Sequence, residues 1–377
     1  MKSVALHNLG CKVNSYELDV MQQYLQNKGY KIVNFNQKAD IYIINTCTVT
    51  NIADRKSRQM LHRAKKQNPD AIVVAVGCYV QTNEDEIEKD DCIDLAIGNN
   101  RKNELVEIIE AYLDKRQSQT PDEQTAASSG KMSGVAPDKT LGHTSVIDIN
   151  AEKEYEEMQL VHTAEHTRAY IKIQDGCDQY CTYCIIPTAR GHICSKPLED
   201  IAPEVQQLVD SGHKEIILTG INLCCYGREF KNGTRLIDAI EAACGCEGDY
   251  RVRIGSVEPE LISDEDILRM SKLEKLCPHF HLSLQSGCDE TLKRMNRHYD
   301  TAEYAELCEK LRRHFPNCAI TTDIMVGFPQ ETDEEFEKSL AFAKKISFAE
   351  THIFPYSRRP TTVADKMKGQ LDRKTKH

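Results

Sequence analysis

The sequence RAYIKIQDGCDQYCTYC, residues 168–184, joins a strand-like run to a dense group of cysteines. Its first seven residues have the apolar pattern of a short β-strand. Cys177, Cys181 and Cys184 follow directly in a C-x3-C-x2-C array. Three thiols within eight residues are too many for packing alone, although a single cysteine often serves only as a small buried hydrophobe. The stretch therefore predicts a metal centre at the end of a strand.

Two kinds of metal centre are consistent with this array. A structural zinc ion needs a fourth protein ligand to complete its tetrahedron, and His192 or Cys194 could supply it. A [4Fe–4S] cluster held by three cysteines instead leaves one iron without a protein ligand. The spacing alone leaves both interpretations open.

The chain around and after this array repeats the arrangement of a strand followed by a helix or loop. Strand-like runs are predicted at residues 168–174, 215–219, 251–256, 279–284, 319–326 and 351–355. Six such strands fit a partial (β/α)6 barrel over residues 166–357 better than a second doubly wound sheet. Active-site groups of such barrels follow the carboxyl ends of the strands. The residues at these places are Cys177, Thr219, Gly220, Ser256, Glu258, Gln285, Ser286, Gly327, Tyr356 and Ser357.

Residues 1–113 form a separate series of strands and helices. Strands are predicted at residues 3–9, 39–45, 71–77 and 93–98, with helices at residues 15–28, 52–67 and 102–112. This alternation is typical of a doubly wound parallel sheet. The predicted fold class is therefore α/β, with an N-terminal doubly wound domain followed by the partial barrel.

A cysteine follows each of the first three predicted strands. Cys11 comes after SVALHNLG, Cys47 after ADIYIINT and Cys78 after AIVVAVG. In an open parallel sheet the carboxyl ends of neighbouring strands share one crevice, so we expect these thiols to converge there. The alternative is that they are three unrelated buried thiols.

Two segments lack this alternation of strands and helices. The stretch QSQTPDEQTAASSGKMSGVAPDKT, residues 117–140, is polar and small, so a flexible linker is predicted over residues 114–165. Residues 358–377 are predicted to form a basic C-terminal tail, which is an RNA-contacting edge or a frayed end.

The composition sets the class of protein. The 377 residues carry a formal net charge of −10, which argues against nucleic-acid binding over the whole surface but not through local patches. The 16 cysteines are about 4% of the chain, short of the ~8–10% of a small disulfide scaffold. No apolar run approaches the ~18 residues of a membrane helix, and the N-terminus lacks a secretory signal. We expect a cytoplasmic protein that does not enter the membrane.

The helix predicted at residues 52–67 has a basic face. Its inward positions are Ala53, Ser57, Met60, Leu61 and Ala64. The other side carries Arg55, Arg58, His62, Lys65 and Lys66. Because the helix begins just after Cys47, beside the expected crevice, we predict that this face contacts the phosphate backbone of RNA. A merely solvated basic face is the alternative.

Several stretches resemble one enzyme family over nearly the whole chain outside the predicted linker. They are LGCKVNSYE (9–17), NTCTVTNIADRKSRQ (45–59), VGCYVQ (76–81), IKIQDGCDQYCTYCIIPTARG (171–191), SVEPEL (256–261), HLSLQSGCDETLKRMNR (281–297), TTDIMVGFPQET (321–332) and HIFPYSRRP (352–360). The sequence resembles the radical S-adenosylmethionine methylthiotransferases. Within them it is most similar to the threonylcarbamoyladenosine tRNA methylthiotransferase branch.

The resemblance implies a role for each matched residue. Cys177, Cys181 and Cys184 would hold a [4Fe–4S] cluster whose open iron binds S-adenosylmethionine. The second triad, of Cys11, Cys47 and Cys78, would hold an auxiliary [4Fe–4S] cluster at which the transferred sulfur attaches. Residues expected to contact S-adenosylmethionine are Tyr183 beside the adenine, and Thr219, Gly220, Glu258 and Gln285 at strand ends.

The resemblance also implies a reaction and its partners. A methylthio group would replace the hydrogen at C2 of N6-threonylcarbamoyladenosine next to the tRNA anticodon, through a deoxyadenosyl radical. The partners would be tRNA, an electron donor such as flavodoxin or ferredoxin, and a sulfur donor. Family members usually continue into a small β-rich RNA-binding module, which we expect to be absent here because the sequence ends at residue 377.

Other functions are consistent with the same cysteines. A sister enzyme would modify isopentenyladenosine in tRNA or an Asp of a ribosomal protein. A protein of a different class would be a metal-binding RNA adaptor without catalysis, with zinc at the Cys177 array and with Cys11, Cys47 and Cys78 merely buried.

Overall fold

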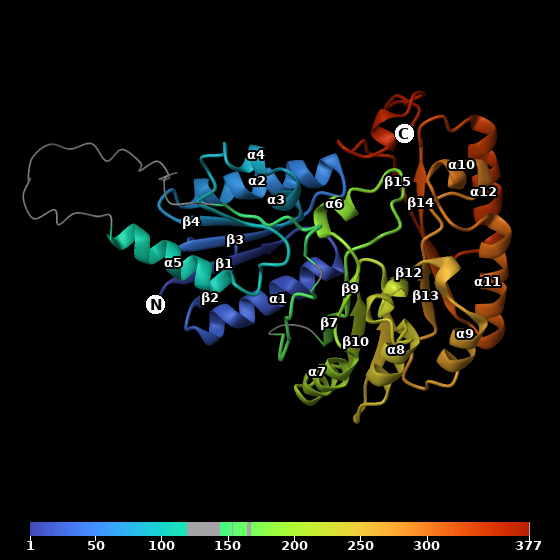
Figure 1. Ribbon diagram of the computed structural model, residues 1–377, viewed down its shortest axis with the longest axis horizontal. Helices are drawn as coiled ribbons and strands as arrows, with labels where there is room; N and C mark the ends of the chain where they lie inside the picture. Colours follow the sequence, from blue (N-terminus) through green and yellow to red (C-terminus); the bar gives the residue numbers. More distant parts are fainter. Residues whose placement is uncertain (119–143, 153, 164–166, 377) are drawn as a thin grey trace, which may run out of the picture.

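Parallel strands organise both halves of the chain in this computed structural model (Figure 1). The structure describes residues 1–118, 144–152, 154–163 and 167–376. Every named ladder is parallel except one short antiparallel pair, β8 (Gln174–Asp175) with β9 (Cys194–Ser195). The α/β fold class predicted from the sequence is confirmed.

The N-terminal half is a six-stranded sheet in the order β2-β1-β3-β4-β5-β6. The strands are β1 (Ser3–Asn8), β2 (Lys31–Val33), β3 (Ile41–Thr46), β4 (Ile72–Gly77), β5 (Leu95–Ile97) and β6 (Thr144–Ser145). One face is covered by α1 (Lys12–Asn27) and α5 (Leu105–Ser118), the other by α2 (Asn51–Gln67), α3 (Cys78–Thr82) and α4 (Glu84–Ile87) (Figure 1). Since helices cover both faces, the central strands β3 and β4 are buried along their whole length.

The second half is a partial barrel of six strand positions. Its strands are β7 (Arg168–Lys172), β10 (Glu215–Thr219), β11 (Arg251–Ile254) with β12 (Ser256–Val257), β13 (His279–Leu282), β14 (Ala319–Val326) and β15 (Glu350–Pro355). β11 pairs with β10 and β12 pairs with β13, so a break at Gly255 divides this strand between two ladders. The order is β7-β10-β11 followed by β12-β13-β14-β15.

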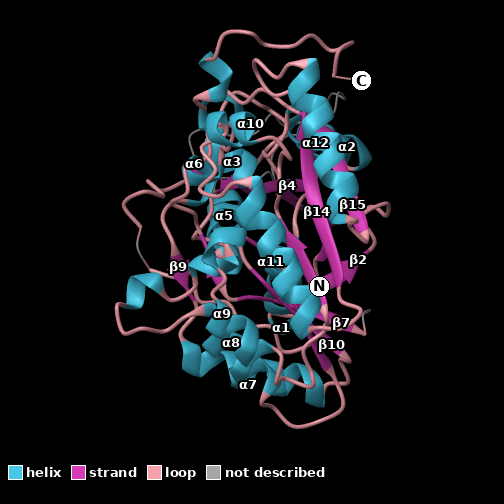
Figure 2. Cartoon of the chain, turned by 90° about the vertical axis from the view of Figure 1, so that its right-hand side faces the viewer, coloured by secondary structure: helices cyan, strands magenta, loops and turns pink. Residues whose placement is uncertain are grey.

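Helices cover the outer side of this barrel. They are α7 (Leu198–Asp210), α8 (Leu236–Cys244), α9 (Asp264–Met270), α10 (Asp289–Arg294), α11 (Thr301–His314) and α12 (Asp333–Ile346). Figure 2 views this half from its outer side and shows α11 and α12 in front of the strands. Reciprocal capping boxes start α11 at Asp300 with Glu303 and α12 at Thr332 with Glu335, which fixes where each helix begins.

A cluster of buried charges lies where the halves meet. Glu17 of α1 is fully buried and forms ion pairs with Lys102 at 2.6 Å and Arg190 at 2.9 Å. Arg190 ends the short helix α6 (Ile186–Arg190) and also pairs with Asp175 at 2.9 Å. Burial alone would raise the pKa of Glu17, but Arg190, Lys102 and Lys172 outweigh it and hold that pKa well below its ordinary value. The carboxylate therefore stays charged inside the protein.

The segment predicted as a flexible linker differs from that prediction at both of its described ends. The helix α5 continues to Ser118, and β6 pairs with β5 as the last strand of the first sheet. The carboxylate of Glu156 accepts hydrogen bonds from backbone N–H groups of Lys102 and Asn103, so this part is packed. The central part of the predicted linker, residues 119–143, lies outside the described residues.

The basic tail is not frayed over its described length. Arg359 is 3% exposed and pairs with Asp54 of α2 at 2.6 Å. The ammonium of Lys376 lies 4.8 Å from the ring centroid of Tyr356. The segment after β15 therefore folds back onto the molecule. The prediction of a frayed end was wrong because the sequence pattern could not show that Arg359 has a buried partner.

Among the described residues, no helix is long and apolar enough to cross a membrane.

Changing Glu17 to Gln tests how much the buried charges stabilise the fold. The change removes a buried carboxylate from Lys102 and Arg190 and should lower the free energy of unfolding by about 3–5 kcal/mol. Glu110→Gln is the matched control, because Glu110 forms an exposed pair with Lys28 and should cost no more than about 1 kcal/mol. Urea unfolding of the whole chain measures the free energy of unfolding of both variants. Equal losses would contradict a special stabilising role for the buried charges between the halves.

Candidate active site

The first cysteine triad lies at the carboxyl ends of adjacent strands. Thr46 of β3 pairs with Gly77 of β4, and Cys47 and Cys78 are the next residues on the two strands. Asn8 of β1 pairs with Asn45 of β3, which places Cys11 at the same edge of the sheet. The predicted convergence of three strand ends is therefore present in the backbone register.

Glycines make room for this approach. Gly10 has φ +119°, and a Cβ at this position would lie 3.0 Å from the Cβ of Cys47. Gly77 has φ +96°, and a Cβ there would lie 2.6 Å from Oδ1 of Asn45. Both the backbone angle and the space therefore favour glycine beside these two cysteines.

Two asparagine side chains contact the first triad. Oδ1 of Asn14 accepts a hydrogen bond from the thiol of Cys11 at 3.4 Å, and Nδ2 of Asn99 donates to Sγ of Cys78 at 3.6 Å. Burial raises the pKa of Cys47 to about 12, and the neighbouring thiols of Cys78 and Cys11 add to this rise. Without metal the thiol of Cys47 is protonated, so metal binding by this thiol would release a proton.

The second triad occupies the loop between β8 and α6. Cys177 donates its backbone N–H to the carbonyl of Gly191 at 3.1 Å, which closes the loop at its base. Gly176 has φ +68° and lies against the backbone of His192, so a side chain at this position would clash. Burial raises the pKa of Cys184 to about 12, with Cys181 as the next contributor. All three cysteines of the loop are half-buried.

An arginine that the sequence analysis did not single out contacts this triad. Nη1 of Arg297 donates to Sγ of Cys181 at 3.3 Å, and Nη2 forms an ion pair with Glu258. Burial is the main cause that raises the pKa of Glu258, whereas Arg297 opposes it. The predicted contact residue Glu258 is thus positioned by an arginine that also touches a cysteine of the loop.

The arrangement distinguishes a single metal ion from a larger group. Tetrahedral zinc binds sulfur at ~2.3 Å, so its ligand atoms lie within about 4 Å of one another. In the described parts of the chain, His62, Asp90 and Cys92 form the one group whose three ligand atoms all lie within 4.8 Å of one another. Neither cysteine triad is so compact, which fits a multi-iron cluster better than one ion.

The two residues proposed as a fourth zinc ligand each contact another group. Nδ1 of His192 is 2.7 Å from Oδ1 of Asp178. Cys194 lies in β9, where it pairs with Asp175, and its thiol is directed to that residue's carbonyl at 3.9 Å. Because metal-bound histidines commonly hydrogen-bond a carboxylate through their other ring nitrogen, the contact of His192 with Asp178 is compatible with zinc. The zinc interpretation of the Cys177 array is disfavoured because its thiols belong to no compact group of ligand atoms among the described residues.

Two buried amide oxygens that follow strand ends of the second half lack a protein partner, and one of them belongs to a residue that contacts the second triad. Asn222 is 3% exposed, and its Nδ2 donates to Sγ of Cys177 at 3.7 Å. Its Oδ1 and the Oε1 of Gln285 have no hydrogen-bond partner among the described residues. Gln285 has φ +64°, a strained angle for a residue with a side chain. Buried acceptors without partners are costly, so these two are available to a polar ligand.

The other residues predicted to contact S-adenosylmethionine lie around the same loop. Tyr183 is half-buried, with its ring centroid 6.4 Å from that of Phe328. Thr219 is buried at the end of β10 and its carbonyl accepts from the N–H of Ile173 at 2.9 Å. A Cβ at Gly220 would lie 2.9 Å from Oε1 of Gln174, so glycine is needed for packing. Thr219 and Gly220 thus have structural contacts of their own.

Arg190 lies between the two triads. It follows Cys184 along α6, and its Nη2 donates to Oδ1 of Asn14 at 2.9 Å, the atom that accepts from Cys11. Nδ2 of Asn99, which contacts Cys78, also donates to the carbonyl of Ala189 at 2.6 Å. The helix that leaves the second triad therefore packs directly on the residues that surround the first.

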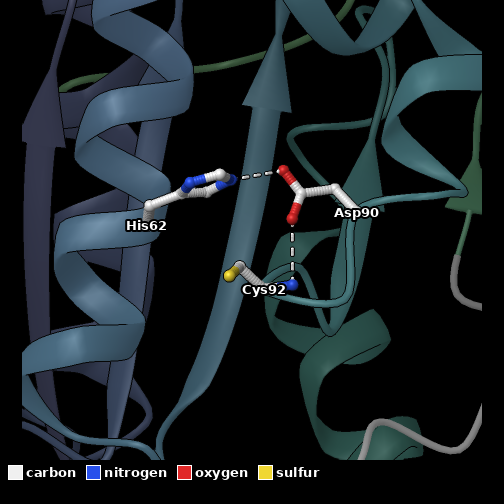
Figure 3. A group of neighbouring side chains, drawn as sticks. All are labelled: His62, Asp90 and Cys92. Carbon is white, nitrogen blue, oxygen red and sulfur yellow. Dashed lines mark hydrogen bonds and ion pairs between the residues drawn. The ribbon is translucent and has the colours of Figure 1, made fainter.

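The basic face of α2 is less available than the sequence indicated. Arg58 donates to the hydroxyl of Tyr79 at 3.1 Å, and Lys65 pairs with Asp94 at 2.8 Å. Figure 3 shows His62 joined to Asp90 at 2.8 Å, with Cys92 beside them. Arg55 and Lys66 are exposed. Three of the five predicted RNA contacts therefore have partners within the protein, and two face solvent.

Comparisons with known proteins agree with this geometry. The profile described as uncharacterized protein family UPF0004 matches residues 3–98, and the Radical SAM superfamily matches residues 171–343. Threonylcarbamoyladenosine tRNA methylthiotransferase MtaB of Bacillus subtilis (strain 168) is 40% identical over 100% of this chain and 78% of its own length. The chain belongs to the radical S-adenosylmethionine methylthiotransferases.

Further relatives extend the comparison. The tRNA-2-methylthio-N(6)-dimethylallyladenosine synthase of Finegoldia magna is 34% identical, over 97% of this chain and 75% of its own length. The radical S-adenosylmethionine methyltransferase TsrM from Kitasatospora setae has a TM-score of 0.66 at 15% identity, covering 97% of this chain and 74% of that chain. This last similarity shows the fold alone.

As a member of this family, the methylthiotransferase is an enzyme that uses S-adenosylmethionine and two [4Fe–4S] clusters. The residues present fit these groups, because neither thiol triad is compact enough for a single ion and Asn222, which contacts Cys177, has an unpartnered buried acceptor. A non-catalytic zinc adaptor, weighed from the sequence, is thus disfavoured.

Four residues of this methylthiotransferase went unassigned in the sequence, namely Arg190, Asn222, Arg297 and Arg359. Three of them lie inside a stretch that resembles the family, Arg190 in PTARG, Arg297 in KRMNR and Arg359 in YSRRP, and Asn222 comes two residues after the strand-end residue Gly220. The position of a residue in or near such a motif could have marked it as functional. Its contacts could not be predicted, because the partner of each side chain is distant in sequence.

Replacing Gln285 by Ala tests whether its free amide oxygen meets S-adenosylmethionine. Loss of one buried hydrogen bond should weaken equilibrium binding of S-adenosylmethionine to the cluster-loaded enzyme about tenfold. Gln330→Ala is the matched control, since Gln330 also has a positive φ of +67° but hydrogen-bonds to the carbonyl of Lys368. Equal effects of the two changes would show that only backbone strain is being measured.

Proposed function

We propose that this enzyme adds a methylthio group to C2 of N6-threonylcarbamoyladenosine next to the anticodon of tRNA. The observation that carries the proposal is the similarity over the whole chain to the Bacillus subtilis relative, whose name states that nucleoside and that transfer. The two thiol triads on either side of Arg190 support it, since such a reaction needs two cofactor sites near one another.

In this proposal the two triads have different roles. Cys177, Cys181 and Cys184 hold the cluster that binds S-adenosylmethionine, and the triad of Cys11, Cys47 and Cys78 holds the auxiliary cluster. When bound, these groups supply radical chemistry for an unactivated aromatic C–H bond and the sulfur that replaces hydrogen.

The chain's own contribution is orientation and charge. Tyr183 would lie beside the adenine of S-adenosylmethionine, and Glu258, held by Arg297, would accept hydrogen bonds from it. Oε1 of Gln285 would do the same from the next strand end. Because Arg190 brings a buried positive charge near the thiols of Cys11 and Cys78, it would balance negative charge at the auxiliary site.

The tRNA contacts proposed for the basic face now centre on two residues. Arg55 and Lys66 are exposed on α2, whose first residue follows Cys47 closely. Arg58, His62 and Lys65 would have to exchange their partners Glu86, Asp90 and Asp94 for phosphate. Phosphate contacts of this kind orient an RNA without reading its sequence.

The reaction requires further partners. An electron donor such as flavodoxin or ferredoxin would reduce the cluster, and a sulfur donor would renew the sulfur. With tRNA as the substrate, the enzyme would work in the cytoplasm.

A second candidate substrate is isopentenyladenosine in tRNA. The Finegoldia magna relative, whose name states the dimethylallyl-modified nucleoside, also matches nearly the whole chain. The two candidates share their cofactors and differ in the group on N6 of the adenine.

Reconstitution with defined tRNA distinguishes these substrates. The cluster-loaded enzyme is given S-adenosylmethionine, reductant and tRNA that carries threonylcarbamoyladenosine, isopentenyladenosine or unmodified adenosine. Mass spectrometry of the digested nucleosides should show the methylthio product only with the threonylcarbamoyl group. A product only with the isopentenyl group would overturn the proposal in favour of the second candidate.

Changing Cys11, Cys47 and Cys78 together to Ala separates the two cofactor sites. Methylthio transfer should be abolished, whereas reductive cleavage of S-adenosylmethionine should remain measurable because the second triad is intact. The iron content should fall by half. Loss of cleavage as well would mean that the first triad is needed for the fold of the whole enzyme.

A further inference from the structure

The segment after β15 contacts the loops of both cysteine triads. We call residues 356–364 the strap. Its Arg359 donates from Nη2 to Oγ1 of Thr48 at 2.8 Å, and Thr48 directly follows Cys47. At its other end the N–H of Ala364 donates to the carbonyl of Thr182 at 2.8 Å, between Cys181 and Cys184. One short segment is thus bonded to both sites.

The contact with the first site is a buried ionic network. Nη1 of Arg359 donates to Oδ2 of Asp54 at 2.6 Å and to Oδ1 of Asn51 at 2.8 Å. Oδ1 of Asp54 accepts from Thr48 at 2.7 Å, and Ser357 Oγ accepts from the N–H of Asn51 at 3.2 Å. Since a buried guanidinium must be paired, these bonds leave the strap little freedom on α2 and the Cys47 loop.

The contact with the second site is mainly apolar. Tyr356 is 4% exposed, and its ring centroid is 5.5 Å from that of Phe328, which in turn packs edge to face with Tyr183. Ala364 is fully buried in the same small core. The strap therefore supports the aromatic residue next to Cys184 while its arginine holds the loop next to Cys47.

We propose that the strap, through Arg359, sets the position of the Cys47 loop relative to the Cys181–Cys184 loop, and that Arg359 is a positioning residue for transfer between the two sites. Arg190 joins the sites on the α6 side, and Arg359 joins them through the segment that follows β15 (Figure 1). The proposal rests on the proposed function only in so far as both loops hold the reacting cofactors.

The position of the two loops should affect how well cleavage of S-adenosylmethionine is coupled to methylthio transfer. A radical generated at one site is useful only if the acceptor at the other site is in place, and a misplacement of about 1 Å can cost on the order of 100-fold in rate. A loosened strap should therefore leave cleavage of S-adenosylmethionine intact while methylthio transfer fails.

The test replaces Arg359 by Met in the cluster-loaded enzyme. Arg358→Met is the matched control, because Arg358 is the neighbouring residue, is exposed and pairs with Asp365 at 2.9 Å. Methylthio product should fall on the order of 100-fold with Arg359→Met, while 5′-deoxyadenosine formation stays within about twofold. The control variant should match the wild type in both.

A readout independent of activity is hydrogen exchange measured by mass spectrometry. In Arg359→Met, exchange should become faster in residues 47–54 and 181–184 but not in the strands β3 and β4. The spin–spin interaction of the two reduced clusters in electron paramagnetic resonance should also change. Arg359→Lys, which keeps the charge, should restore part of the product yield.

A double variant, Asp54→Asn with Arg359→Met, guards against simple misfolding because it leaves no buried unpaired carboxylate. It should retain its iron, and methylthio transfer should still fail while S-adenosylmethionine is cleaved. Coupled transfer in this variant, or exchange in the two loops like that of the wild type, would overturn the proposal. If the wild-type enzyme fails to modify tRNA, the proposed function is wrong. The hydrogen-exchange data would still test whether Arg359 holds the two loops in position.

Discussion

The structure depends on the neutralisation of Arg190, whose guanidinium is buried between the two halves. Glu17 comes from the first half and Asp175 from the second, and both bind the same guanidinium nitrogen. Because an unpaired charge at this depth would be costly, both carboxylates stabilise the contact between the halves. That pairing brings α6, the helix leaving the second cysteine loop, onto the residues around the first.

Parallel strands explain the remainder of the site. In each half the chain turns at the carboxyl ends of strands, which is where a parallel fold leaves room for ligands. The first half places cysteines on three strand ends, and the second places a cysteine loop, Glu258 and Gln285 on others. The ion pairs of Arg190 with Glu17 and Asp175, together with the strap, then hold these two sets of strand ends together. The active site is therefore a property of the assembled halves.

Much of this could be predicted from sequence, because it depends on local pattern. The α/β fold class and the family are confirmed, and the strand ends that carry Cys11, Cys47 and Cys78 lie in register as expected. Side-chain partners far apart in sequence could not be predicted. Nothing in a basic helix shows that His62 meets Asp90, or that Arg359 meets Asp54 across 305 residues. The linker prediction was too long for the same reason, since Glu156 is buried against the backbone of Lys102 and Asn103, which lie 54 and 53 residues earlier in the chain.

The central claim is that two separate thiol triads each hold an iron–sulfur cluster in one active site. Anomalous X-ray diffraction from anaerobically grown crystals, collected above the iron and zinc edges, tests it most directly. The account predicts two iron peaks, one among Cys11, Cys47 and Cys78 and the other beside the Cys177 loop, with no zinc peak at either. A single iron peak, or zinc at the Cys177 loop, would contradict it.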